Sequence, residues 1–227
     1  MLQVEIAITT LEDALQAQSG GADSIEISYD LSVGGLTPSL DLVRRIRDAL
    51  SIQVHAIVRP HARDFIYTPA EIDTILADTS ALAQTGIDGI VFGAHQPDRR
   101  LDIDLIKQVA AAASPLPVTL HRALDECLEP EAGLEALRGI VPRVLTSGPA
   151  ATAWEGREGL KRWVETVGND FHFVAAGSLR LEFLEEYAAF VRAPAYHFGS
   201  AARTNGIVDS EKVRQIRSLL NGLPVPE

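Results

Sequence analysis

The chain has 227 residues and a mass of 24.5 kDa, with 46% hydrophobic and 22% charged residues. This composition is typical of a globular protein and excludes a disordered or fibrous chain. The formal net charge of −11 and the pI of about 5.0 argue against a nucleic-acid or anionic-membrane partner, because both are bound through an excess of Lys and Arg. A local basic pocket for a small anion remains compatible with this charge.

The cysteine content and the N-terminus predict an intracellular location. Cys127 is the single cysteine, so an intrachain disulfide cannot form. No run of eighteen apolar residues is found, and the first residues lack the basic and apolar regions of a signal peptide. We therefore expect a cytoplasmic protein without a membrane partner.

Short apolar runs alternate with longer amphipathic stretches along the whole chain. The expected strands are Leu2–Ile8, Ser24–Tyr29, Gln53–Pro60, Gly89–His95, Pro117–Ala123, Arg143–Gly148, His172–Gly177 and Tyr196–Ser200. The expected helices are Leu11–Gln18, Leu40–Leu50, Pro69–Thr85, Ile103–Ala113, Glu131–Ile140, Gly156–Val167, Leu181–Val191 and Ser210–Leu220.

This alternation predicts a single-domain (β/α)8 TIM barrel over residues 1–227. Strands joined by helices are parallel, and eight units in 227 residues average about 28 residues each. A doubly wound dinucleotide-binding sheet would need a glycine-rich turn after the first strand. Thr9-Thr10-Leu11-Glu12 is not such a turn.

Polar side chains inside apolar strands mark a candidate catalytic site, because barrel enzymes place their chemistry at the carboxyl ends of the strands. An unpaired carboxylate buried in a strand is costly, so neighbouring carboxylates, histidines and arginines indicate an assembled polar site. The alternative is a buried ion-pair network that fixes the barrel and binds no ligand. The candidate catalytic residues are Glu5, Glu26, His55, Arg59, His121 and Arg122.

A candidate anion site follows from small residues at the ends of the last three strands. Such residues let backbone N–H groups approach a ligand, and the loops after strands seven and eight commonly hold phosphate in barrels. The alternative is that these residues only form turns. The candidate anion-binding residues are Ser147, Gly148, Gly177, Ser178, Ser200 and Arg203.

The residue types give little support for a resident metal, and we expect none. Copper(I) prefers thiolate or thioether ligands, and the chain has only Cys127 and Met1. No pair of histidines four residues apart lies on an expected helix, and no C-x-x-C is present.

A series of short motifs resembles the CutC family, described as cytoplasmic copper-homeostasis proteins with a TIM-barrel fold. The motifs run in family order over nearly the whole chain and are specific as a set. They include Val4-Glu5-Ile6, Gly21–Glu26, Gly34–Ser39, Val58-Arg59-Pro60, Asp64–Tyr67, Gly89–Gly93, Pro115–Ala123, Arg143–Gly148 and Ser200–Arg203. The resemblance implies a role in copper homeostasis, with copper as the implied ligand.

The chain departs from that family at the thiols proposed to hold copper(I). Family members often carry cysteine where this chain has Ala7 and Ser28, and tend to have Gly-Gly-Gly where it has Gly177-Ser178-Leu179. Three functions therefore stay open: copper homeostasis, an uncharacterised barrel enzyme acting on a small anionic or phosphorylated metabolite, and a non-catalytic binding module. We also expect a homodimer, since two-fold symmetry is the commonest arrangement of oligomers.

Overall fold

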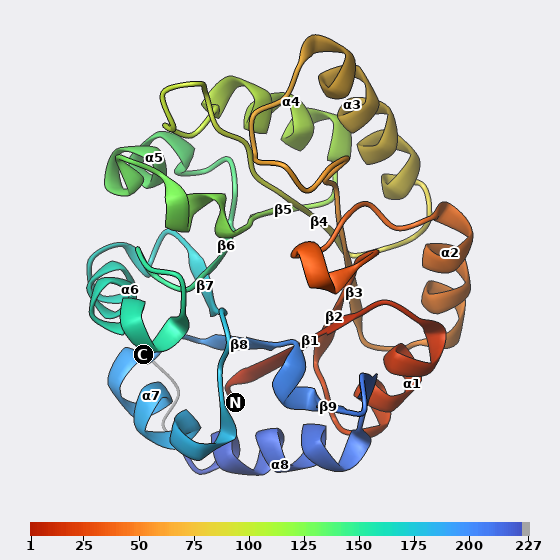
Figure 1. Ribbon diagram of the computed structural model, residues 1–227, viewed down its shortest axis with the longest axis vertical. Coiled ribbons are helices and arrows are strands. Elements are labelled where there is room, and N and C mark those ends of the chain that lie inside the picture. The colour runs from red at the N-terminus through yellow and green to blue at the C-terminus, as the bar shows by residue number, and fades with distance from the viewer. Residues whose placement is uncertain (224–227) are drawn as a thin grey trace.

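The computed structural model describes residues 1–223, and its central feature is a closed barrel of eight parallel strands in chain order. Each strand pairs with the next, and the last pairs with the first, so that the sheet has no free edge (Figure 1). This confirms the predicted TIM barrel. The strands are β1 (Gln3–Ile8), β2 (Ser24–Ile27), β3 (Gln53–Ile57), β4 (Gly89–Phe92), β5 (Val118–Leu120), β6 (Arg143–Thr146), β7 (His172–Ala175) and β8 (Ala195–Phe198).

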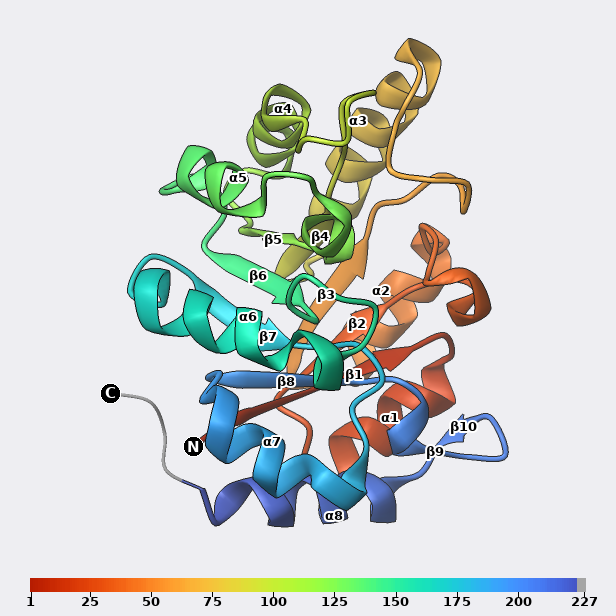
Figure 2. The same ribbon diagram turned by 60° about the vertical axis from the view of Figure 1, so that its left-hand side comes forward.

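Eight helices form the outer layer around these strands (Figure 2). Within residues 1–223, none of them is long and apolar enough to cross a membrane. The helices are α1 (Leu11–Ser19), α2 (Leu40–Ala49), α3 (Pro69–Ala83), α4 (Ile103–Ala113), α5 (Pro130–Leu137), α6 (Ala153–Val167), α7 (Leu184–Val191) and α8 (Ser210–Asn221).

Capping side chains determine where the helices begin. Thr68 and Glu71 form a reciprocal capping box at α3, with Pro69 at the first helical position. Ser39 and Asp209 cap α2 and α8 in the same general way. Helix α6 begins three residues earlier than predicted because Thr152 accepts a hydrogen bond from the backbone N–H of Glu155.

The strands end sooner than predicted, and this changes the position of two candidate residues. Strand β3 ends at Ile57 and β5 at Leu120, so Arg59 and His121 lie in the loops beyond the strands. Short 3-10 turns that were not predicted occupy several of these loops. They are η1 (Leu31–Val33), η2 (Arg122–Glu126), η3 (Leu181–Phe183) and η4 (Ser200–Ala202), and a small hairpin of β9 (Arg203–Thr204) and β10 (Ile207–Val208) follows η4.

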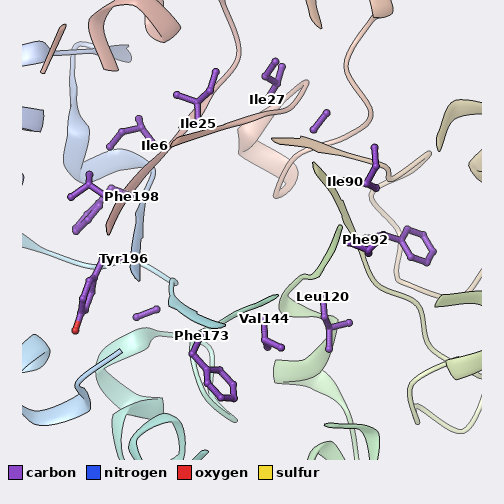
Figure 3. Close-up of a cluster of buried hydrophobic side chains, with 14 of the residues drawn as sticks. Ile6, Ile25, Ile27, Ile90, Phe92, Leu120, Val144, Phe173, Tyr196 and Phe198 are labelled. Carbon is purple, nitrogen blue, oxygen red and sulfur yellow. The ribbon is translucent and has the colours of Figure 1, made fainter. Parts of the chain in front are cut away.

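The main hydrophobic core lies between the barrel and the helices. Alternate residues of each strand point outward and are fully buried there (Figure 3). The other residues of each strand face the interior of the barrel, where Leu145, Val174, Ala176 and Ala195 form a small apolar cluster. Polar side chains share the rest of the interior with a few apolar ones, such as Ile57 and Val91. The outward residues include Ile6, Ile25, Ile27, Ile90, Phe92, Leu120, Val144, Phe173, Tyr196 and Phe198.

Candidate functional site

Strand register brings polar residues from four neighbouring strands, β8, β1, β2 and β3, to the inside of the barrel. Glu5 of β1 is paired with Ser24 of β2 on one side and with His197 of β8 on the other. Glu26 of β2 is paired with His55 of β3. Because laterally paired residues in a sheet point to the same face, all five side chains enter the interior.

Glu5 is the centre of a hydrogen-bonded group that we call the floor network, made of Glu5, Ser24, Arg143 and His197. The carboxylate of Glu5 accepts hydrogen bonds from the Ser24 hydroxyl at 3.0 Å, from Arg143 at 2.7 Å and from His197 Nδ1 at 2.9 Å. The Glu5 side chain is only 1% exposed. Both carboxylate oxygens therefore accept hydrogen bonds from the protein, and Arg143 supplies a countercharge, as a buried carboxylate requires.

The floor network fixes the charge states of its members. Burial alone would raise the pKa of Glu5, but Arg143 and the hydrogen bond from His197 hold that pKa well below its ordinary value. Burial opposes a charged His197, yet its hydrogen bond to Glu5 and the nearby Glu26 raise the pKa of His197. Glu5 is thus an ionised anchor, and His197 favours the imidazolium form.

Arg143 and His197 are absent from the predicted set of site residues. Arg143 reaches Glu5 across the barrel from a position 138 residues away in the chain, and no local pattern signals this pairing. The alternation of side chains along β6 and β8 places both residues on the inner face of the barrel, and this alternation was the available sequence signal. The structure thus places Glu5 in an ion-pair network within the barrel.

Above the floor network, at the carboxyl ends of the strands, lies a pocket of about 1200 Å³ that we call the mouth pocket. Four of the six candidate catalytic residues line it, and Glu5 and His55 do not. His55 is 5% exposed and neither of its ring nitrogens has a hydrogen-bond partner within residues 1–223. Its burial lowers its pKa, so it is a neutral interior side chain. The four that line the pocket are Glu26, Arg59, His121 and Arg122, together with His197.

Glu26 differs from Glu5 in having no hydrogen-bond donor among the described residues. Its side chain lines the mouth pocket, although the residue as a whole is only 8% exposed. Burial raises the pKa of Glu26, and the neighbouring Glu5 adds to this, while His197 acts against it. A buried carboxyl group with a raised pKa in a pocket is a candidate for proton exchange with a ligand.

Arg59 fastens two loops over the rim of the mouth pocket. Its guanidinium donates to the backbone carbonyls of Val33 at 2.9 Å and Gly35 at 3.4 Å, and it lies 4.8 Å from the ring centroid of Phe65. The loop that it holds includes η1, which projects over the barrel in Figure 1 (orange). Much of its hydrogen-bonding capacity is therefore used to hold these loops.

Arg122 is held by a buried carboxylate that is absent from the predicted set, that of Asp125 in η2. The Asp125 side chain is 3% exposed and accepts from Arg122 at 2.7 Å. It also accepts from the Ser147 hydroxyl at 2.7 Å, from the Ser147 backbone N–H, and from the Thr146 hydroxyl. An Asp three residues after an Arg in a short turn was the signal that could have indicated this pair.

This arrangement removes two residues from the predicted anion site. Both polar groups of Ser147 already donate to Asp125, and the N–H of Gly148 donates to the Thr146 hydroxyl at 2.9 Å. Neither residue lines the mouth pocket. The nearby carboxylate of Asp125 would also repel an anion there. The structure therefore does not support Ser147 and Gly148 as anion ligands.

Backbone donors after β7 and β8 remain free. Within residues 1–223, the N–H groups of Gly177, Ser178, Gly199 and Ser200 donate to no protein acceptor. All four residues line the mouth pocket. Gly177 has a φ of 99°, and a Cβ there would lie 2.7 Å from the Ser147 side chain, so this position requires glycine.

Arg203, the last predicted anion ligand, lines the same side of the pocket but is already engaged. It donates to the carbonyls of Gly199 at 2.9 Å and Ala7 at 2.8 Å, and to Asp13 at 3.2 Å. It contributes positive charge near the free N–H groups, and its hydrogen bonds position the loop that carries them.

Two groups of side chains bear on metal binding. Glu5, Glu26 and His197 have ligand atoms within 4.8 Å of one another, but both carboxylate oxygens of Glu5 already accept hydrogen bonds in the floor network. These oxygen and imidazole ligands do not match the soft donors that copper(I) prefers. The residues that would match are placed elsewhere, because Cys127 does not line the mouth pocket and Met1 is 87% exposed.

The chain was compared with known proteins. The model of the CutC family matches residues 2–202. A CutC family protein from Mesorhizobium japonicum is 37% identical over 198 residues, covering 87% of this chain and 77% of the relative. The human copper homeostasis protein cutC homolog is 40% identical over 163 residues, covering 71% of this chain and 60% of the human protein.

Solved structures show the same architecture. The crystal structure of CutC from Streptococcus agalactiae superposes with a TM-score of 0.83 at 22% identity, covering 88% of this chain and 99% of that one. Phosphoribosylanthranilate isomerase from Thermotoga maritima gives a TM-score of 0.64 at 19% identity, with 98% and 100% coverage, which shows a common fold alone. The family match and the identity to its members agree with the predicted resemblance, and the chain belongs to the CutC family.

Proposed function

We propose that the mouth pocket binds a small anionic, phosphorylated metabolite and that Glu26 exchanges a proton with it. The observation that carries this proposal is the pairing, in one pocket, of a buried carboxyl group without a hydrogen-bond partner and four free backbone N–H groups. Among the described residues, these N–H groups belong to half-buried or exposed positions of the pocket wall, so a bound anion can reach them and accept their hydrogen bonds.

The free N–H groups suit a phosphate. The N–H groups of Gly177, Ser178, Gly199 and Ser200 come from the loops after β7 and β8, the usual phosphate position in barrels. Phosphate oxygens accept several hydrogen bonds at once, and Arg203 lies at the same edge. In contrast, Ser147 and Gly148 are excluded because Asp125 and Thr146 already occupy their donors.

Proton exchange is supported by the Glu26–His197 pair. Both side chains line the mouth pocket, and the raised pKa makes the Glu26 carboxylate a stronger base than an ordinary glutamate. His197 is oriented by its hydrogen bond to Glu5 and stabilises the ionised form of Glu26. Glu5 itself acts as a positioning residue, through His197.

A thermal-shift and calorimetry series tests the anion site. Inorganic phosphate and glycerol 3-phosphate, each compared with its uncharged counterpart or with chloride at equal ionic strength, should raise the melting temperature of the wild type. Ser200→Glu should abolish this effect by repulsion at an exposed position, whereas the neutral Ser200→Gln should retain it. Equal effects of phosphate on the two variants, or no stabilisation of the wild type, would reject the proposal.

A second candidate, copper homeostasis, is favoured by the names of the relatives. The residues of this chain do not fit a thiolate copper(I) site: Ala7 and Ser28 replace the thiols that the family is proposed to use, and Cys127 lies outside the pocket. We infer that any role in copper homeostasis does not require tight copper(I) binding by this chain.

Competition against a strong copper(I) chelator checks this inference. The wild type should yield its copper to the chelator. If one equivalent is retained, the inference is wrong, and Cys127→Ser would then show whether that thiol is responsible.

A further inference from the structure

His121 lines the mouth pocket and has a neutral ring. The residue lies directly after β5, and its Nδ1 accepts a hydrogen bond from the backbone N–H of Ala123 at 3.1 Å. A ring nitrogen that accepts a hydrogen bond carries no proton, so the proton of the neutral ring is on Nε2.

That Nε2 atom is buried, and within residues 1–223 it has no hydrogen-bond partner. The ring belongs to the lining of the mouth pocket and packs against Phe65, with 4.7 Å between ring centroids. An unsatisfied buried donor in the wall of a pocket points to an acceptor on the ligand.

The surroundings of His121 keep the ring neutral. Its burial, with Arg59 and to a smaller extent His95 and Arg122 nearby, lowers the pKa of His121 to about 3. No carboxylate offsets these groups at the ring, because the nearby Asp125 is already bonded to Arg122. A neutral imidazole N–H can stabilise a developing oxyanion by donating a hydrogen bond to it, without transferring its proton.

We propose that His121 Nε2–H donates to a carbonyl oxygen of the bound anion, and that the pocket promotes enolisation of a phosphorylated aldehyde or ketone. The inference rests on the proposed function and names its substrate class. The Glu26 carboxylate removes a proton from the carbon next to the carbonyl, and the C–H electron pair becomes the C=C bond of the enolate. The carbonyl π electrons move to the oxygen that His121 holds. Glu26 then returns the proton to carbon, so no oxidant or reductant is needed.

Binding of an enolate mimic tests the donor role. Isothermal titration of the full chain compares phosphoglycolohydroxamate, which mimics an enolate, with ethyl phosphate, which has no carbonyl group. The wild type should bind the hydroxamate about 100-fold more tightly, the lower end for transition-state analogues. His121→Phe should lose at least about tenfold of that preference while its affinity for ethyl phosphate stays within about twofold. His121→Gln, which keeps an N–H donor, should recover part of the preference.

The outcomes separate the two proposals. If the wild type binds both compounds equally, the donor role is overturned and the anion site stands. If it binds neither, the proposed function fails, and the inference with it. His61→Gln is the matched control: His61 faces Glu71 outside the mouth pocket, so both affinities should be unchanged.

The tautomer can be measured without a ligand. In protein labelled with ¹⁵N-histidine, the His121 resonances, assigned by comparison with His121→Gln, should show a neutral ring with its proton on Nε2 from about pH 8 down to about pH 5. A ring that is protonated at about pH 5, or that carries its proton on Nδ1, would overturn the inference.

Discussion

The floor network and the mouth pocket contain similar residue types but differ in how their hydrogen bonds are satisfied. Glu5 accepts hydrogen bonds from Ser24, Arg143 and His197, so its carboxylate needs nothing from outside the protein. Glu26 lies on β2 two residues beyond Ser24, the strand partner of Glu5, yet it has no donor among the described residues. A buried carboxylate thus stabilises the barrel in the floor network, whereas the carboxyl group that lines the mouth pocket is available to a ligand.

The arginines of the barrel are also already bound to protein groups. Arg143 completes the floor network, and Arg122 and Arg59 hold loops through Asp125 and through backbone carbonyls. Among the described residues that line the mouth pocket, the groups without a protein partner include the four backbone N–H groups, the Glu26 carboxyl and His121 Nε2. The residue type alone therefore does not identify the ligand-binding groups of a polar barrel. What identifies them is whether each group already has a hydrogen-bond partner in the protein.

Removing Glu5 should have the largest effect on stability. Glu5→Gln leaves Arg143 buried without a countercharge, and breaking such a pair typically costs about 3–5 kcal/mol. The melting temperature should fall by roughly 6–20 °C for a chain of this size. Thermal unfolding of Glu5→Gln, Arg143→Met and the double variant Glu5→Leu/Arg143→Met provides the measurement.

The double variant sharpens the comparison. Because it removes both charges, it should lose less stability than the sum of the two single variants. Additive losses, or a loss below about 1 kcal/mol for Glu5→Gln, would show that Glu5 is not the anchor of a satisfied network.

His121 should make the wild type less stable in mild acid. Its pKa is lowered from 6.5 to about 3, so at pH 5 the unfolded chain binds a proton that the folded chain does not. Stability from this group is complete above about pH 6.5 and is lost as the pH falls toward 3. At pH 5 the loss is roughly 2 kcal/mol, from 1.5 pH units at 1.36 kcal/mol each.

Urea unfolding at pH 7 and pH 5 measures this effect. His121→Gln should show a decrease in stability between the two pH values that is smaller than that of the wild type by about this amount. Identical decreases in the two proteins would mean that the ring is protonated in the folded state, which contradicts its neutral role in the mouth pocket.

Glu26→Gln should give the smallest change in stability, and of the opposite sign to Glu5→Gln. Since the pKa of Glu26 is raised, its contribution is favourable below about pH 4.5 and is lost as the pH rises through the folded-state value. At pH 8 the buried negative charge of Glu26 destabilises the folded protein. Its removal should therefore raise the free energy of unfolding of the ligand-free protein by about 0.5–2 kcal/mol.

Glu126→Gln is the matched control for this variant. Glu126 also lines the mouth pocket but is exposed, so its change should stay within about 0.5 kcal/mol. A large destabilisation by Glu26→Gln would place Glu26 in the floor network and remove it from the binding groups.

The barrel and the inward position of several polar residues could be predicted from local sequence patterns. Apolar runs interrupted by Glu5 or Glu26 indicate a strand with a polar inner face, and alternation fixes which residues share that face. The caps at Thr68 and Asp209 were likewise visible in the sequence.

The hydrogen-bond partners in the site could not be predicted in this way. Arg143 reaches Glu5 only because the barrel closes, and Asp125 reaches Ser147 only because η2 folds over β6. Such contacts join residues far apart in the chain, so a pattern within one strand or loop does not contain them. For this reason Ser147 and Gly148 were predicted as anion ligands, although their donors are occupied.

Amide shift mapping during a phosphate titration tests the central claim most directly. In ¹H–¹⁵N spectra of the full chain, glycerol 3-phosphate should produce saturable shifts of the amides of Gly177, Ser178, Gly199 and Ser200, while those of Ser147 and Gly148 move little. This outcome is predicted because only the first group has free N–H donors facing the mouth pocket. Shifts centred on Ser147 and Gly148, shifts scattered over surface residues, or no saturable shifts would contradict the account.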